Sequence, residues 1–123
     1  MVGFLHVPEH KRGALVLTHG AGANCESPLL IAVADAFQEA GYYVLRCDLP
    51  FRQARRFGSP HPSHAAADRE GLRSAVLALE RLSGVRASMG GHSYGGRQAS
   101  ILAAEDPSLT ERLLLFSYPL HPS

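Results

Sequence analysis

The chain has 123 residues, of which 46% are hydrophobic and 19% charged, the composition of an ordinary globular protein with one core. A formal net charge of +1 provides no overall attraction to nucleic acid or to an anionic membrane, and we expect neither partner. No apolar run approaches the roughly 18 residues of a membrane span, and the N-terminus lacks the pattern of a signal peptide. The sequence therefore predicts a single cytoplasmic domain over residues 1–123.

The first half of the chain alternates short apolar runs with helical patterns. Residues 14–17 (ALVL) form a continuous apolar run, typical of a strand buried on both faces. Ser27, which precedes a proline, is typical of a helix start, and Gly41 is typical of its end. A second strand is predicted over residues 42–49. Residues 51–62 show no periodicity and are expected to form a long loop.

The second half repeats this alternation. A long helix is predicted after Ser63 and ends at Gly84, and a short strand follows over residues 85–89. A helix over residues 95–105 leads to a last buried strand, residues 113–116 (LLLF). Such alternation predicts an α/β fold with three layers, α/β/α, around a mostly parallel sheet. Ligands of such sheets bind outside the carboxyl ends of the strands.

The pentapeptide GHSYG lies between the predicted strand 85–89 and the helix that follows. A serine hydroxyl is a weak nucleophile until it is exposed, oriented and deprotonated, and a tight strand-to-helix turn presents it at the floor of a pocket. Glycine is needed two residues to either side, and Gly91 and Gly95 meet this need. The pattern predicts Ser93 as a nucleophile. The alternative is a glycine-rich turn with an incidental serine.

A second loop of small residues, 19–24 (HGAGAN), follows the first buried strand. Acyl transfer develops negative charge on a carbonyl oxygen, which two preorganised N–H groups can stabilise. The backbone N–H groups of Ala21 and Tyr94 are the predicted donors of this oxyanion hole. Gly20 and Gly22, in the same loop, are candidate substrate-binding residues. A plain tight turn is the alternative interpretation of the loop.

The side chains predicted to contact a substrate are Arg52 and His92. Arg52 belongs to a local basic cluster with Arg55 and Arg56, and guanidinium groups near a pocket attract anionic substrates. The alternative for this cluster is a solvated loop whose charge aids solubility. His92 lies next to the nucleophile, and packing is the alternative use of its side chain.

The residues that commonly bind metals do not form a metal-ligand pattern. Cys25 and Cys47 have no such spacing, and each is expected to be a small, partly buried side chain. His61 and His64 frame a loop without further ligands, and His6 is expected on an edge segment. We therefore predict no metal site.

The same glycine loop permits a second interpretation. Gly20-x-Gly22 between a strand and a helix, with Asp48 at the end of the next strand, resembles a dinucleotide-binding fingerprint. Cys25 stands where a third small residue is required, and Pro28 begins the helix too late for its N-terminus to hold a pyrophosphate. A dinucleotide-binding domain is therefore the less favoured alternative.

Four segments carry a family resemblance: THGAGAN, RCDLPFRQ, GGHSYGGRQAS and LLLFSYPLHP. They resemble the α/β-hydrolase superfamily, in particular compact hydrolases near dienelactone hydrolase and a related group with hydrolase-like domains in chromatin complexes. The resemblance implies a serine hydrolase that attacks an ester-like carbonyl of a small molecule through Ser93, with Ala21 and Tyr94 as oxyanion hole. It also implies that there is neither a metal nor an organic cofactor, and that His19 anchors the loop and is not the catalytic base.

The acid and the base of a catalytic triad are not evident. In this family they follow the nucleophile in the order acid, then histidine, after later strands, and the chain stops after residues 113–116. The histidine downstream of Ser93 is His121, which no acid after that strand would orient. The downstream acids precede the strand and are expected at the opposite edge of the sheet: Glu105, Asp106 and Glu111.

Three explanations of this gap stay open. The chain is a truncated hydrolase that is incomplete or weakly active alone, or a natural short form that a second subunit completes, or a non-catalytic binding or assembly module. Because no later strand covers the last apolar strand, residues 113–116, we also expect a homo-oligomer formed through that exposed sheet edge.

Overall fold

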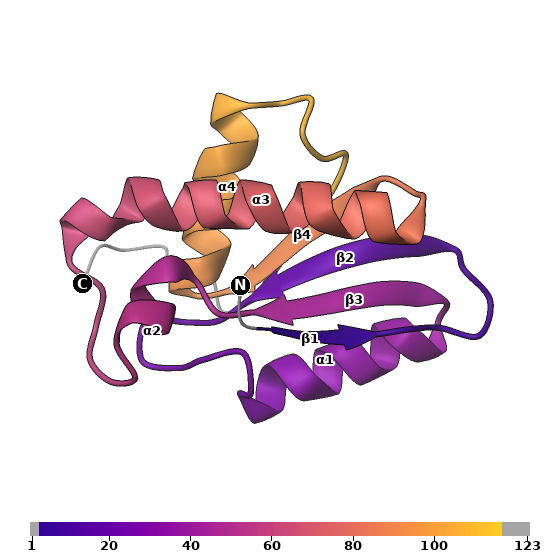
Figure 1. Ribbon diagram of the computed structural model, residues 1–123, viewed down its shortest axis with the longest axis horizontal. Helices are drawn as coiled ribbons and strands as arrows, with labels where there is room; N and C mark the ends of the chain where they lie inside the picture. The colour runs from indigo at the N-terminus through magenta and orange to yellow at the C-terminus, as the bar shows by residue number, and fades with distance from the viewer. Residues whose placement is uncertain (1–2, 117–123) are drawn as a thin grey trace.

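The computed structural model describes residues 3–116 and shows a five-stranded sheet with helices on both faces (Figure 1). Within this part of the chain, no helix is long and apolar enough to cross a membrane. The elements follow one another in this order: β1 (Gly3–His6), β2 (Gly13–Thr18), α1 (Pro28–Glu39), β3 (Tyr42–Cys47), α2 (Pro50–Ala54), the 3₁₀ turn η1 (Pro62–His64), α3 (Ala65–Ser83), β4 (Ala87–His92), α4 (Tyr94–Glu105) and β5 (Leu113–Phe116).

The strands lie in the order β1-β3-β2-β4-β5, and every neighbouring pair is parallel except β1 with β3. The predicted α/β fold with a mostly parallel sheet is confirmed. The carboxyl ends of β2, β3 and β4 share one edge, so the loops after Thr18, Cys47 and His92 meet there. From β2 the chain passes to β3 on one side and later to β4 on the other, and ligands of such sheets bind at this switch in direction.

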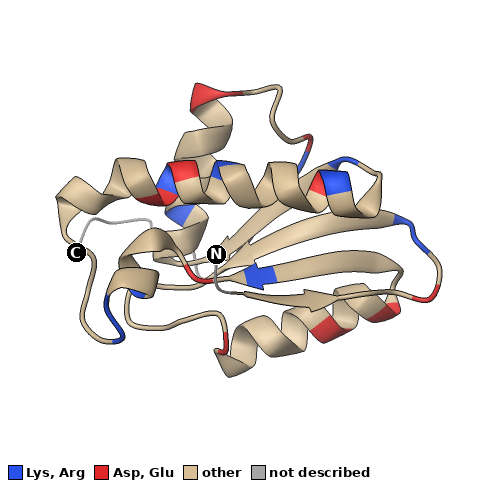
Figure 2. Cartoon of the chain, in the orientation of Figure 1, with Lys and Arg blue, Asp and Glu red and all other residues tan. Residues whose placement is uncertain are grey.

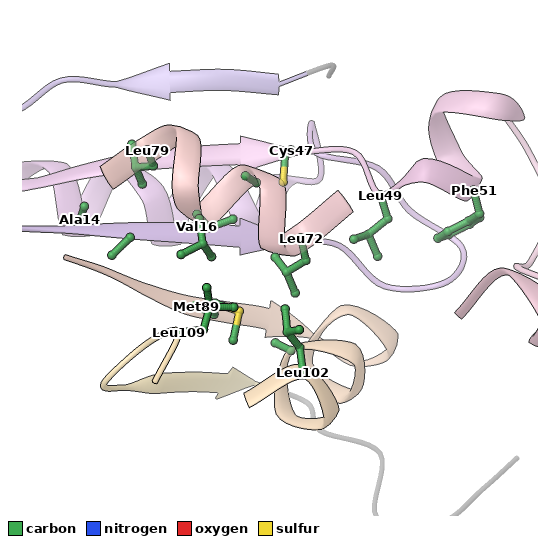
Figure 3. Close-up of a cluster of buried hydrophobic side chains, with 14 residues drawn as sticks. Ala14, Val16, Cys47, Leu49, Phe51, Leu72, Leu79, Met89, Leu102 and Leu109 are labelled. Atoms are coloured by element: carbon green, nitrogen blue, oxygen red, sulfur yellow. The ribbon is translucent and has the colours of Figure 1, made fainter. Parts of the chain in front are cut away.

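Two layers of apolar side chains hold the helices against the sheet. On one face α1 buries Leu30 and Ala34 against Leu15, Leu17 and Val44. On the other face α3 and α4 pack over the larger cluster, whose side chains Figure 3 shows between the helices and the strands. Since β2 contributes to both layers, it is buried on both faces, as its continuous apolar run predicts. Members of the larger cluster are Val16, Leu72, Leu79, Met89 and Leu102.

The ends of the two long helices are as the sequence predicts. The hydroxyl of Ser27 accepts a hydrogen bond from the N–H of Leu30 at 3.3 Å, which caps α1. Gly41 follows α1 with a φ of 102°, and Gly84 ends α3 with a φ of 76°. Both angles lie in the left-handed region, where a side chain is strained, so glycine is the residue that ends each helix without that cost.

The structure differs from the predicted elements in several places. β3 ends at Cys47 and β4 begins at Ala87, so both strands are shorter at these ends than predicted. β1 adds an antiparallel edge strand where the sequence indicates only an edge segment. β4 runs on to His92 because Gly90 and Gly91 continue to pair with β5 despite the low strand propensity of glycine. The segment 51–62, predicted as a loop, begins inside the short helix α2, which is anchored by the buried ring of Phe51.

β5 forms one edge of the described sheet, where it pairs with β4. The strand is not buried as predicted, because Leu113 and Leu115 are 39% and 38% exposed. An edge strand with exposed leucines is a surface on which further strands can pair. Self-association through this edge stays a prediction.

Candidate active site

The predicted nucleophile, Ser93, lies in the tight turn between the end of β4 and the start of α4. Its φ of 52° and ψ of −111° make it the single non-glycine residue with positive φ among residues 3–116. Such a conformation costs about 1–3 kcal/mol and persists only where the surroundings enforce it. The N–H of Ser93 donates to the carbonyl of Phe116 at 3.2 Å, which ties the turn to β5. Ser93 itself is partly exposed.

Two glycines allow this turn to be so tight. A Cβ atom on Gly91 would lie 2.4 Å from the backbone of both Gly95 and Gly96. A Cβ atom on Gly95 would lie 2.3 Å from the hydroxyl oxygen of Thr18 and 2.5 Å from the carbonyl oxygen of His19. All these separations are too short for real atoms, so the backbone can approach this closely only without side chains. The steric reason for glycine at both positions is as the sequence predicts.

The loop 19–24 lies directly beside this turn because β2 and β4 are neighbours, with Thr18 opposite Gly91. A Cβ atom on Gly20 would lie 3.6 Å from the Cβ of Ser93, which is van der Waals contact. Tyr94 is the first residue of α4, so its N–H has no acceptor within the helix. The fold thus brings Ser93, Gly20 and Tyr94 together, whereas the function of the Ala21 and Tyr94 amides as an oxyanion hole stays a prediction.

His19 is completely buried and holds this loop in place. Its Nε2 accepts a hydrogen bond from the N–H of Leu49 at 3.0 Å, so Nε2 carries no proton. Its Nδ1 lies 2.8 Å from the carbonyl oxygen of Gly20 and must therefore be the protonated donor. Because both nitrogens are engaged, the neutral imidazole cannot accept a proton from Ser93. His19 is a loop anchor, as the family resemblance implies.

Burial lowers the pKa of His19 below its ordinary value. In the unfolded chain the imidazole gains a proton as the pH falls through about 6.5, whereas the folded chain resists protonation. The stability that depends on neutral His19 is therefore complete above this pH and is lost progressively below it. We expect the free energy of unfolding, measured by urea titration, to fall below about pH 6.5 by at most about 1.4 kcal/mol per pH unit. The variant His19→Gln should lack this part of the pH dependence, and identical slopes in both proteins would contradict the assignment.

Arg52, a candidate for binding an anionic substrate, is only 5% exposed and has a different role. Its guanidinium donates to the carbonyl oxygens of Ala23 at 2.7 Å, Ala21 at 2.7 Å, Gly58 at 2.9 Å and Arg55 at 3.1 Å. It also lies over its neighbour's ring, that of Phe51, at 4.8 Å from the centroid. Since backbone carbonyls occupy these donors, Arg52 fixes the loop 19–24 to α2 and is not a free anion receptor. The Arg55 and Arg56 side chains are exposed, as the alternative of a solvated loop predicts.

A buried carboxylate that the sequence analysis missed binds Tyr94, the residue after Ser93. Asp68, on α3, is completely buried and accepts hydrogen bonds from the N–H of Phe51 at 3.0 Å and from the hydroxyl of Tyr94 at 2.7 Å. Burial, and then the hydrogen bond to Asp68, raises the pKa of Tyr94. The available signal was an acidic residue four positions before Leu72, on the apolar stripe of the helix.

Three further candidates lie around the turn in different environments. The ring of His92 stacks on Phe116 with centroids 5.9 Å apart, and its buried Nδ1 has no hydrogen-bond partner among the described residues. A Cβ atom on Gly22 would meet nothing within 4 Å, so this part of the loop faces open space. Asp48 accepts from the N–H of Cys25 at 2.8 Å and thus also fixes the loop. Contact of His92, Gly20 or Gly22 with a substrate stays a prediction.

Among residues 3–116, neither cysteine is an activated base, and the cysteines and histidines do not take part in a metal-binding cluster. Burial raises the pKa of both Cys25 and Cys47 to about 12, so these thiols are not reactive thiolates. Around η1, Nδ1 of His64 accepts a hydrogen bond from the N–H of His61, and Nδ1 of His61 accepts one from the N–H of Ser63. Residues 3–116 contain no cluster of three metal-binding side chains.

The downstream acids Asp106 and Glu111 lie away from Ser93. Asp106 follows the far end of α4, where Arg73 binds it and lowers the pKa of its carboxyl group. Glu111 pairs with Arg86 at 3.0 Å beside the start of β4. Asp106 thus lies at the end of α4 that is far from Ser93, and Glu111 lies at the end of β4 that is far from Ser93. His121 lies outside the described residues.

Several solved structures with this fold are named as hydrolases. Dienelactone hydrolase from Anabaena variabilis is 25% identical, with a TM-score of 0.75 over 92% of this chain and 55% of that chain. An alpha-beta serine hydrolase homologue from Coxiella burnetii is 14% identical, with a TM-score of 0.79 over 96% of this chain and 57% of that one. A probable hydrolytic enzyme from Pseudomonas aeruginosa is 30% identical, with a TM-score of 0.67 over 92% and 35%. The chain therefore spans about half or less of the length of these proteins.

Two comparisons of the sequence itself give different results. A comparison with curated protein sequences finds no match. A family model described as an alpha/beta hydrolase domain, however, matches residues 11–123, which is nearly the whole chain. Together with the strand order and the strained turn at Ser93, this match shows that the chain belongs to the α/β-hydrolase domain family.

Proposed function

We propose that this chain is the nucleophile-bearing part of a serine hydrolase that attacks an ester-like carbonyl of a small molecule through Ser93. The observation that carries the proposal is the positive φ of Ser93 in the turn between β4 and α4. A binding module has no need of a strained serine at this point, whereas a nucleophile does because the strain presents its hydroxyl. Hydrolase family membership supports the same chemistry.

In the proposed reaction the Ser93 hydroxyl adds to the substrate carbonyl, and the N–H groups of Ala21 and Tyr94 stabilise the oxyanion. One donor of this kind increases the rate about 10²–10³-fold. The positive end of the α4 dipole, at Tyr94, favours the same charge. No metal or organic cofactor enters this scheme.

The proton of Ser93 needs an acceptor, and His19 cannot be that acceptor because both of its nitrogens are engaged. We propose that the catalytic histidine and acid come from outside residues 3–116, in the same polypeptide or in a second one. Without them, an oxyanion hole and binding alone leave only weak catalysis. We therefore expect slow acylation by the chain on its own.

A fluorophosphonate probe tests this proposal because it reacts covalently with activated serines. We expect slow labelling of the chain, detected as an intact-mass increase and located on Ser93 by peptide mapping. Ser93→Ala should abolish the labelling, whereas the exposed serine Ser74→Ala should leave it unchanged. Equal labelling of Ser93→Ala would contradict the proposal, and no labelling would favour the alternative of a non-catalytic binding or assembly module.

A further inference from the structure

Three neighbouring parallel strands each begin directly after an arginine. Arg12 precedes β2, Arg86 precedes β4 and Arg112 precedes β5. Because β2, β4 and β5 are adjacent in the sheet, the three residues gather at its amino edge. Figure 2 shows basic segments at the end of the sheet where β2 and β4 begin, with the turn at the far end of β4. A six-residue strand spans about 20 Å, so this edge is remote from Ser93.

The three arginines line one cavity of about 320 Å³. This volume lies at the lower end of the range for small-molecule pockets, about 300–1,000 Å³. The wall also includes the hydroxyl-bearing side chains of Tyr42 and Ser88. The ring of Tyr42 packs against Phe37 with centroids 5.2 Å apart, so this part of the wall is held in place. The cavity therefore places neutral hydroxyl-bearing residues beside cationic ones.

Positive charge predominates in this cavity. One carboxylate lines it, that of Glu111, against three guanidinium groups, which leaves a net charge of +2. Arg86 pairs with Glu111 at 3.0 Å and donates to the carbonyl of Ser108 at 2.7 Å. Within residues 3–116, the side chains of Arg12 and Arg112 have neither a hydrogen bond nor an ion pair. Two guanidinium forks are thus available to a ligand.

Of these two arginines, Arg112 is the stronger candidate for binding an anion. Arg12 also borders a neighbouring cavity that contains the carboxylates of Glu9, Asp35 and Glu39, so part of its field is offset there. Arg112 and Ser88 directly precede Leu113 and Met89, which pair across β5 and β4, and both residues line the cavity. A ligand between them would meet both a charged and a neutral donor.

We propose that this cavity binds a dianionic phosphate group, either as inorganic phosphate or as part of a small phosphate monoester. A dianion matches the net charge of +2, and phosphate oxygens match the planar forks of arginine as well as single hydroxyl donors. The mostly polar lining does not suit an apolar ligand. The site is separate from Ser93, and its existence does not depend on the proposed hydrolase activity.

The test titrates the full chain with inorganic phosphate and, separately, with phenyl phosphate. Isothermal titration calorimetry measures affinity, and amide chemical shifts in nuclear magnetic resonance spectra locate the ligand. We expect saturable binding that weakens with added sodium chloride, with shifts at Gly13, Ser88 and Leu113 and none at Gly20 or Tyr94. Tighter binding of phenyl phosphate than of inorganic phosphate would assign a monoester as the ligand, and equal affinities would assign the phosphate group alone.

The matched variants are Arg112→Gln and Arg81→Gln. Arg81 is an exposed arginine on α3 that does not line the cavity, so its loss removes the same charge elsewhere. Arg112→Gln should weaken phosphate binding about tenfold or more, and Arg81→Gln should change it less than twofold. Thermal unfolding checks that both variants are folded. Equal effects of the two variants, the absence of saturable binding, or tighter binding of acetate than of phosphate would overturn the proposal.

Discussion

Gly95→Ala is expected to destabilise the folded chain by about 3 kcal/mol or more. The new methyl carbon would lie 2.3 Å from the hydroxyl oxygen of Thr18 and 2.5 Å from the carbonyl oxygen of His19. The hydroxyl can rotate away, but the carbonyl belongs to the backbone of the loop that His19 anchors, so α4 must shift relative to β2. Overpacking a well-filled site costs about 1–3 kcal/mol or more, and this site offers no space for relaxation. The free energy of unfolding in urea measures the effect.

Gly22→Ala is the matched control for this substitution. It makes the same chemical change in the loop beside the turn, where a Cβ atom would meet nothing within 4 Å. We expect its unfolding free energy to stay within about 0.5 kcal/mol of the original chain. If the Gly95→Ala variant had the same unfolding free energy as the Gly22→Ala variant, this result would contradict the close packing of the turn against β2.

Arg52→Ala is expected to cost about 2–4 kcal/mol. The substitution removes a buried guanidinium that holds four backbone carbonyls, two of which belong to Ala21 and Ala23 in the loop beside Ser93. Losing charge-assisted hydrogen bonds leaves those carbonyls without partners in a partly buried site. Urea unfolding measures the loss, and hydrogen exchange should be faster for the amides of the loop.

The neighbouring arginine provides the control. Arg56→Ala removes an exposed guanidinium from the same segment and should change the unfolding free energy by less than about 0.5 kcal/mol. Arg52→Lys separates the two roles considered for this residue, because lysine keeps the charge but cannot donate to four carbonyls at once. An anion receptor would tolerate lysine without loss of stability, whereas a loop anchor would not. Full stability of Arg52→Lys would therefore contradict the structural role.

The parts of the fold that follow from local chemistry could be predicted from the sequence. The run ALVL is apolar at every position, which is the pattern of a strand covered on both faces, and β2 is such a strand. Gly84 and Ser27 mark helix ends by steric and hydrogen-bonding rules that act within a few residues. β4 was harder to delimit because Gly90 and Gly91 disfavour a strand locally, and only pairing with neighbours keeps them extended.

In the candidate site, too, some features could be predicted from local sequence and others depend on tertiary packing. Ser93 and its flanking glycines could be predicted because the demand for small residues is set by backbone distances inside one short turn. The burial of Arg52 and Asp68 could not, because it depends on where α2 and α3 pack relative to the loop after β2. A charged residue in the sequence looks the same whether it faces solvent or a set of carbonyls. Asp68 binds Phe51 from 17 positions away, and Arg52 binds Ala21 from 31 positions away.

The hydrogen bond from the Ser93 N–H to the Phe116 carbonyl links the proposed nucleophile to β5, an edge strand of the described sheet. Edge strands open more readily than central ones, because fewer neighbours must separate. Detachment of β5 would break this bond and remove one constraint that holds Ser93 at its positive φ. We therefore expect any contact that holds β5 in place also to stabilise the conformation of Ser93.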